Sequence, residues 1–96
     1  MRHLYLLLTV FGLMISTFSY AGQVEYDDCI LKYLKGAKLD MATNYIRRAC
    51  NENFKNPNFA SNARKEYNRC LLSNLVGIES VQAVMEINKA CQSKHK

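Results

Sequence analysis

The sequence predicts an all-α fold in which two tandem disulfide-stapled αα-hairpins, four short helices in all, follow an N-terminal signal peptide. Three observations lead to this prediction. The chain opens with an apolar run, its four cysteines fall at equal spacings within a duplicated segment, and apolar residues recur with the helical period. Neither hairpin is long enough to bury its apolar face alone, so the two are expected to pack together.

The N-terminal segment, residues 1–21, has the composition of a secretory signal peptide. Arg2 and His3 give it a positive start, an almost unbroken apolar run covers residues 4–18, and small residues precede the expected cleavage after Ala21. A helix that spans a bilayer needs roughly twenty apolar residues, so an uncleaved anchor is the weaker interpretation. A periplasmic or secreted location is therefore predicted, with membrane contact at most peripheral after cleavage.

Cleavage would leave a single helical domain, residues 22–96. Loss of Arg2 reduces the 13 Lys and Arg of the full chain to 12, against 8 Asp and Glu, which gives a formal charge of +4. A domain of this size has a small core and is commonly stapled. An even number of cysteines in a small exported chain is typical of a disulfide framework.

An internal repeat organises this domain. Cys29 and Cys50 are 21 positions apart, and so are Cys70 and Cys91. Residues 26–50 align without a gap on residues 67–91 at an offset of 41, with nine identities in twenty-five positions. The identical pairs are Tyr26/Tyr67, Cys29/Cys70, Leu31/Leu72, Leu34/Leu75, Gly36/Gly77, Ala42/Ala83, Ile46/Ile87, Ala49/Ala90 and Cys50/Cys91. The two segments are interpreted as copies of one unit.

Each unit is predicted to contain two helices. Apolar residues in the first helix of each unit recur at spacings of three and four, and Gly36 stands where a left-handed glycine cap would end that helix. Ser80 is a suitable N-cap for the last helix, whereas the helix from Asp40 has no such residue and relies on its carboxylate. The second helices are expected to bury one face, made of Ala42, Tyr45, Ile46, Ala49 and Cys50 in one unit and Ala83, Val84, Ile87, Ala90 and Cys91 in the other.

The units are joined by residues 51–62, which are rich in asparagine and contain Pro57. This composition favours turns over regular structure, so the segment is predicted to be a linker. Phe54 and Phe59 are too apolar for a fully solvated linker, and one or both are expected to pack across the two units.

The repeat geometry ranks the three pairings that four cysteines allow. Antiparallel helices bring the start of the first helix next to the end of the second, which favours Cys29 with Cys50 and Cys70 with Cys91. Crossed pairing between the units stays open. These disulfide cysteines are the only site residues that the sequence predicts.

Catalytic and cofactor chemistry finds little support in the sequence. There is no CxxC or CxxCH motif, and His95 in the tail is the only histidine after the signal segment, so neither a thiol exchange motif nor a mixed zinc site is predicted. The acidic cluster of Glu25, Asp27 and Asp28 is interpreted as favouring the first turn of a helix. We expect no cofactor, no metal and no enzymatic activity.

Two surface features could instead serve binding. Tyr33 and Tyr45 either mark an interaction surface or form half-buried rims of the core, and the second interpretation is preferred. A basic group around the linker could converge into one patch, although solvated surface explains it as well. That group consists of Arg47, Arg48, Lys55, Arg64, Lys65 and Arg69.

The string CILKYLKGAKLDMATNYIRRAC resembles a motif of small exported bacterial four-cysteine proteins that carry a duplicated C-x20-C helical hairpin. Both units share the pattern, although Val81 replaces the acidic position taken by Asp40. The resemblance implies export, helices and the cysteine framework, and it implies no active site because no activity is assigned to such proteins.

Two functions are compatible with these features. The first is an exported protein-interaction or accessory module that binds another exported or envelope protein. The alternative is a cationic membrane-active or cell-wall-active protein, for which a charge of +4 is low. Nucleic acid is not expected as a partner of an exported chain.

Overall fold

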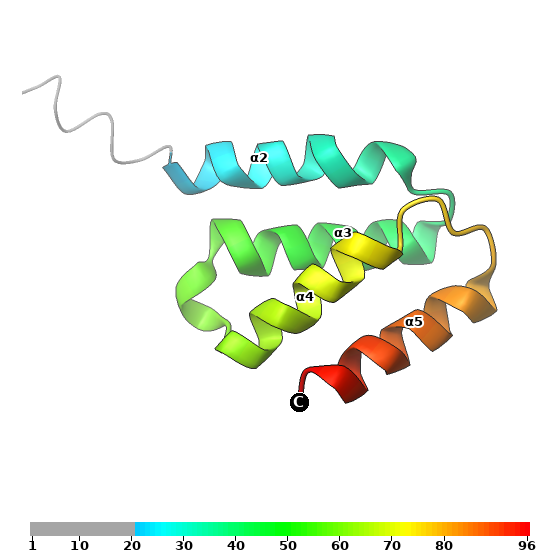
Figure 1. The fold of residues 1–96 in the computed structure, drawn as a ribbon. Helices are drawn as coiled ribbons and strands as arrows, with labels where there is room; N and C mark the ends of the chain where they lie inside the picture. Colours follow the sequence, from blue (N-terminus) through cyan, green and yellow to red (C-terminus); the bar gives the residue numbers. More distant parts are fainter. Residues whose placement is uncertain (1–20) are drawn as a thin grey trace, which may run out of the picture.

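The computed structural model describes residues 21–96, so the predicted signal peptide lies outside it except for Ala21. Four α-helices and three short helical turns make up this part of the chain, and it contains no strand, which confirms the predicted fold class (Figure 1). The elements are α2 (Ala21–Tyr33), η1 (Leu34–Gly36), α3 (Asp40–Cys50), η2 (Asn51–Lys55), η3 (Pro57–Phe59), α4 (Asn62–Asn74) and α5 (Val81–Lys94). Among these residues no helix is long and apolar enough to cross a membrane.

Helix α3 is the centre of the fold. It contacts α2, α4 and α5, and α4 in turn packs between α3 and α5 (Figure 1). Most of the core therefore comes from α3 and α4, whereas α2 and α5 lie on the outside. The core residues are Cys29, Ala42, Ile46, Ala49, Cys50, Tyr67, Leu71, Leu72, Leu75, Val84 and Cys91.

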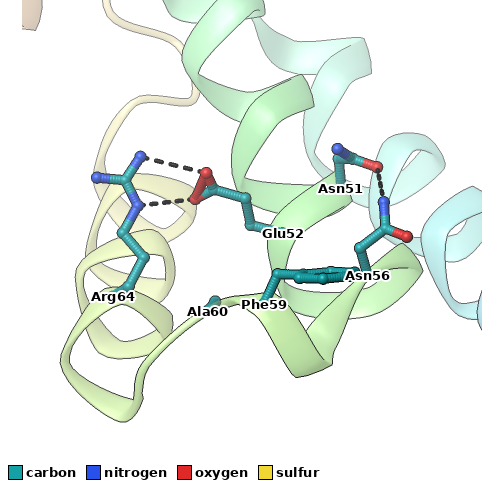
Figure 2. Close-up of a pocket in the computed structure, with 6 residues that line it drawn as sticks. All are labelled: Asn51, Glu52, Asn56, Phe59, Ala60 and Arg64. Atoms are coloured by element: carbon teal, nitrogen blue, oxygen red, sulfur yellow. Dashed lines mark hydrogen bonds and ion pairs between the residues drawn. The ribbon is translucent and has the colours of Figure 1, made fainter.

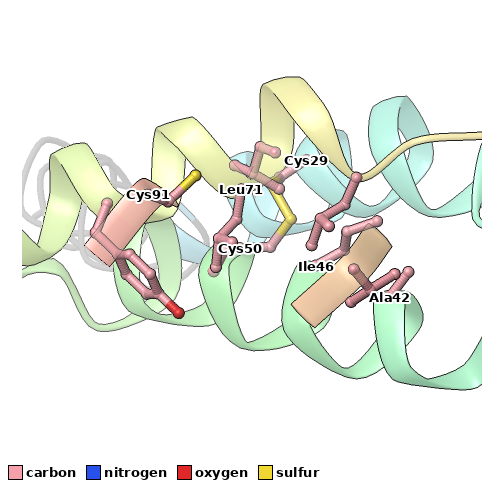
Figure 3. Close-up of a cluster of buried hydrophobic side chains, with 11 residues drawn as sticks. Cys29, Ala42, Ile46, Cys50, Leu71 and Cys91 are labelled. Carbon is pink, nitrogen blue, oxygen red and sulfur yellow. A yellow bond between two sulfur atoms is a disulfide. The ribbon is translucent and has the colours of Figure 1, made fainter. Parts of the chain in front are cut away.

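Two disulfides close the hairpins. One joins Cys29 to Cys50 and the other joins Cys70 to Cys91, with a Cα–Cα distance of 5.7 Å in each. This is the pairing within units that the repeat geometry favours. The first disulfide lies among the buried side chains of α3 and α4 (Figure 3), so it contributes to the core as well as closing a loop.

The helix starts follow their capping residues. The Ser80 hydroxyl accepts a hydrogen bond from the backbone N–H of Ala83 at 3.3 Å, which confirms the predicted cap of α5. Ser61 caps α4 in the same way through the N–H of Arg64. Helix α3 begins after Leu39 without a side-chain cap, and Asp40 lies in its first turn as expected.

The two repeat-related glycines have different roles, and the prediction for Gly36 is wrong. Among residues 21–96 only Gly77 has a positive φ, of +82°, whereas Gly36 ends η1 without one. Gly36 lies in close packing instead, because a Cβ at this position would lie 2.5 Å from Cγ1 of Val76, so the Val76 side chain would have to shift. The N–H of Gly77 also donates to the carbonyl oxygen of Gly36 at 2.9 Å, so the turns of the two hairpins meet.

The variant Gly36→Ala is therefore expected to lose about 1–3 kcal/mol of unfolding free energy, because the added methyl group overpacks the contact between the turns. Urea denaturation of the oxidised protein measures the loss. The double variant Gly36→Ala/Val76→Ala removes the clashing methyl group and should recover most of it. If the double variant is no more stable than Gly36→Ala, packing against Val76 is not the reason for the glycine.

Candidate interaction surface at the elbow between the repeats

The segment that joins the units, residues 51–62, is mostly helical, whereas its composition favours turns over regular structure. Helix α3 continues directly into the π-helix η2, because Cys50 and Asn51 both keep helical backbone angles. The N–H of Asn56 donates to the carbonyl of Asn51 at 3.0 Å, the wider spacing of a π-turn. Pro57 then opens η3. We call residues 51–60 the elbow.

A polar network fixes the elbow to α4. The Arg64 guanidinium donates to both carboxylate oxygens of Glu52, at 2.8 and 3.3 Å (Figure 2). The Asn68 amide, only 1 % exposed, donates to Glu52 at 3.0 Å and to the side-chain oxygen of Asn53 at 2.9 Å. Asn53 in turn donates to the carbonyl of Lys65. The elbow is thus held by four side chains that satisfy one another.

The charges of this network reinforce one another. Partial burial alone would raise the pKa of the Glu52 carboxyl, but hydrogen bonds from Arg64 and Asn68, together with the charges of Arg64 and Arg48, leave the pKa lowered. The hydrogen bond to Glu52 is the main reason why the pKa of Arg64 is raised. Both groups are therefore charged at neutral pH, and the network persists until the carboxylate is protonated.

The pKa of the Glu52 carboxyl is lower in the folded protein than its ordinary value of 4.5. The ionised carboxylate therefore stabilises the fold above pH 4.5, and this stabilisation is lost as the pH falls through the folded pKa. We expect Glu52→Gln to lose about 1 kcal/mol at neutral pH, as a partly exposed pair allows. Urea denaturation at low salt, at pH values on both sides of the transition, should show the difference between wild type and variant shrinking in acid. A difference that does not change with pH would rule out this role.

Phe59 is the most exposed large apolar residue of the elbow. Of the two phenylalanines of which one or both were expected to pack, Phe54 packs against the core, whereas the Phe59 side chain is 90 % exposed. The physical reason is the turn at Pro57, which carries η3 away from the helices. A shallow pocket lies beside Phe59, and the amide of Asn56 donates to Asn51 at its wall (Figure 2). Its lining residues are Asn51, Glu52, Asn56, Phe59, Ala60 and Arg64.

The elbow presents an exposed apolar group beside polar ones. An exposed phenyl ring beside amide groups suits an apolar side chain flanked by polar backbone. Every cysteine of residues 21–96 is in a disulfide, and the described part of the chain contains no group of three His, Cys, Asp or Glu that could hold a metal ion.

The basic residues predicted around the linker belong to three elements, α3, η2 and α4. Four of the six are engaged with separate partners: Arg64 with Glu52, Arg69 with Glu66, Arg48 with the ring of Tyr45, and Lys55 with the ring of Tyr26. A cation over an aromatic ring and an ion pair both hold a charge in a fixed place. The charges are therefore distributed over several elements.

The other predicted surface residues are found mainly at the core rim. Tyr33 and Tyr45 are half-buried against the core, as the preferred interpretation expected. Glu25, Asp27 and Asp28 are exposed, but α2 begins at Ala21, so they lie beyond its first turn. The dipole explanation for this cluster is therefore wrong, because the dipole effect fades after one turn.

Sequence reasoning missed the polar network of Glu52, Asn53 and Asn68. A signal was present in the repeat, because Asn68 and Asp27 are polar residues at equivalent positions next to core residues. Its partners come from the segment that was predicted to be a linker, so the contact could not be foreseen.

Comparison with known proteins agrees with the resemblance seen in the sequence. The model of the family described as "Four-cysteine protein VF_A0006-like" matches residues 7–95. Neither the curated proteins nor the solved structures contain a match to the chain. The match covers both disulfide-closed hairpins and the elbow between them. The chain therefore belongs to the four-cysteine VF_A0006-like family.

Proposed function

We propose that this protein is an exported protein-interaction module that binds another exported or envelope protein through its elbow. The observation that carries the proposal is Phe59, which is 90 % exposed on a segment that is otherwise fixed. A large apolar side chain on a rigid surface is typical of the anchors of protein interfaces.

The elbow is well suited to hold such an anchor in place. Its start is fixed by the disulfide at Cys50 and its other side by the ion pair of Glu52 with Arg64. A surface that is already ordered loses little conformational entropy on binding. We therefore expect the partner to offer an apolar pocket for Phe59, bordered by groups that hydrogen-bond the amides of Asn51 and Asn56.

Export is supported by the disulfides rather than by the elbow. Disulfides form and persist in oxidising compartments, and both bonds are present within a small helical domain. A partner in the same compartment, either a soluble exported protein or the exposed domain of an envelope protein, follows from this location.

Crosslinking followed by affinity capture from the exported fraction tests the proposal. Wild type is expected to recover one partner in a stoichiometric amount, and Phe59→Ser should lose it. Val81→Ser is the matched control, because Val81 is an exposed apolar residue of α5, away from the elbow. Equal recovery by wild type and Phe59→Ser would show that the elbow is not the binding surface.

A further inference from the structure

The duplication leaves two apolar surfaces uncovered. On α4, Leu72 is 3 % exposed because α3 packs against it, whereas the equivalent Leu31 on α2 is 60 % exposed. Tyr67 and Leu75 are also buried, but their identical counterparts on α2 and η1 are only half-buried. Those counterparts are Tyr26 and Leu34.

On the outer face of α5, small and apolar residues are more exposed than the equivalent residues of α3. Ala42, Ile46 and Ala49 of α3 are 0 % exposed, because this stripe packs onto the second hairpin. The same three residue types recur on α5, where Ala83 and Ile87 are only partly buried and Ala90 is exposed. The prediction that Ala90 is buried is therefore wrong, because no further helix of residues 21–96 covers this face of α5.

The uncovered surface on α2 is part of a groove. It is lined by residues of α2, by Leu34 of η1 and by Arg47 of α3. In the second unit the equivalent positions lie between α4 and α5, where α3 packs against both helices. The lining residues are Tyr26, Asp27, Ile30, Leu31, Leu34 and Arg47, which correspond to Tyr67, Asn68, Leu71, Leu72, Leu75 and Asn88.

The groove and the end of α5 also carry polar groups that can pair with each other. Within the chain, Asn68 donates hydrogen bonds to Glu52 and Asn53, which follow α3. At the position equivalent to Asn68, the first unit has Asp27, whose carboxylate accepts hydrogen bonds. At the positions equivalent to Glu52 and Asn53, the end of α5 has Ser93 and Lys94, which can donate them. Asp27 in the groove and Lys94 near the end of α5 therefore have opposite charges.

We propose that α5 of one copy docks into the groove between α2 and α3 of a second copy, as α3 docks onto α4 within the chain, with Lys94 of the first copy paired to Asp27 of the second. The occupant is a second copy because the internal interface supplies the template for both surfaces. The contact is head-to-tail, so a pair of copies keeps one free groove, on the first copy, and one free α5 face, on the second. This inference goes beyond the partner proposed for the elbow and does not use Phe59.

Sedimentation velocity of the oxidised exported protein over a wide concentration range tests the proposal. The average mass of wild type is expected to rise with concentration. Leu31→Arg blocks the groove and Ala90→Arg blocks the α5 face, and each should weaken self-association at least about tenfold, or about 1.4 kcal/mol. Met85→Arg is the matched control, because Met85 is a half-exposed residue of α5 outside the stripe; it should associate like wild type.

A mixture of the two blocked variants gives the sharpest result. Leu31→Arg retains an intact α5 face and Ala90→Arg an intact groove, so the mixture should form a one-to-one dimer and nothing larger. Asp27→Lys should weaken association, and the double variant Asp27→Lys/Lys94→Glu should restore it. A wild type that stays monomeric at all concentrations, or association that neither blocking variant changes, would overturn the proposal. Neither outcome bears on partner capture through Phe59, so the two proposals fail separately.

Discussion

Replacement of Ile46 by alanine is expected to lower the free energy of unfolding by about 2–5 kcal/mol. Ile46 is 0 % exposed on the central helix α3, where it packs within the core formed with α4 (Figure 3). A loss of this size is a large part of the stability of a small domain, so the variant should be close to its unfolding midpoint at moderate temperature. Urea denaturation with both disulfides intact measures it.

The repeat provides the control for this prediction. Ile87 is the identical residue of the second unit, but it is only partly buried on the outer helix α5. Ile87→Ala should therefore cost less than half as much as Ile46→Ala, because fewer contacts are removed and water already reaches the site. Equal losses at the two positions would contradict the placement of α3 at the centre of the fold.

Removal of the first disulfide by Cys29→Ala/Cys50→Ala is expected to cost about 3 kcal/mol from the chain entropy of the unfolded state. Both cysteines are buried, so a small cavity adds to this loss. The thermal midpoint of the variant should fall by more than ten degrees, as the small size of the domain implies.

The second disulfide serves as the matched comparison. Cys70→Ala/Cys91→Ala opens a loop of the same length, because the cysteines are 21 positions apart in both cases. The loss of stability from chain entropy should therefore be similar. The further loss from the cavity should be smaller, because Cys70 is only partly buried. If removal of the first disulfide leaves the thermal midpoint unchanged, the bonds do not staple the hairpins.

The features that the sequence predicts correctly are local or fixed by the repeat. The N-cap at Ser80 depends on one hydroxyl and a nearby N–H, and the pairing of Cys29 with Cys50 depends on the length of a single hairpin. Apolar periodicity likewise identifies the face of α3 that is buried. Each of these inferences needs only a short stretch of chain.

The features that it misses depend on how the two units meet. A duplicated sequence predicts equal burial for Ala49 and Ala90, but two units in a chain form only one interface between them, so Ala49 is buried in it and Ala90 is exposed. Gly36 has the same explanation, since the side chain that excludes a Cβ belongs to Val76 of the other unit. The exposure of Phe59 depends on where the elbow turns, which no local pattern specifies.

A tryptic digest without reduction tests the central claim, two hairpins each closed by its own disulfide in an exported chain. All four cysteines fall in different tryptic peptides. We predict that GQVEYDDCILK, beginning at Gly22, is linked to ACNENFK, and that CLLSNLVGIESVQAVMEINK is linked to ACQSK. Crossed links, or free thiols on a first peptide that begins at His3, would contradict the disulfide-closed repeat and export of the processed chain.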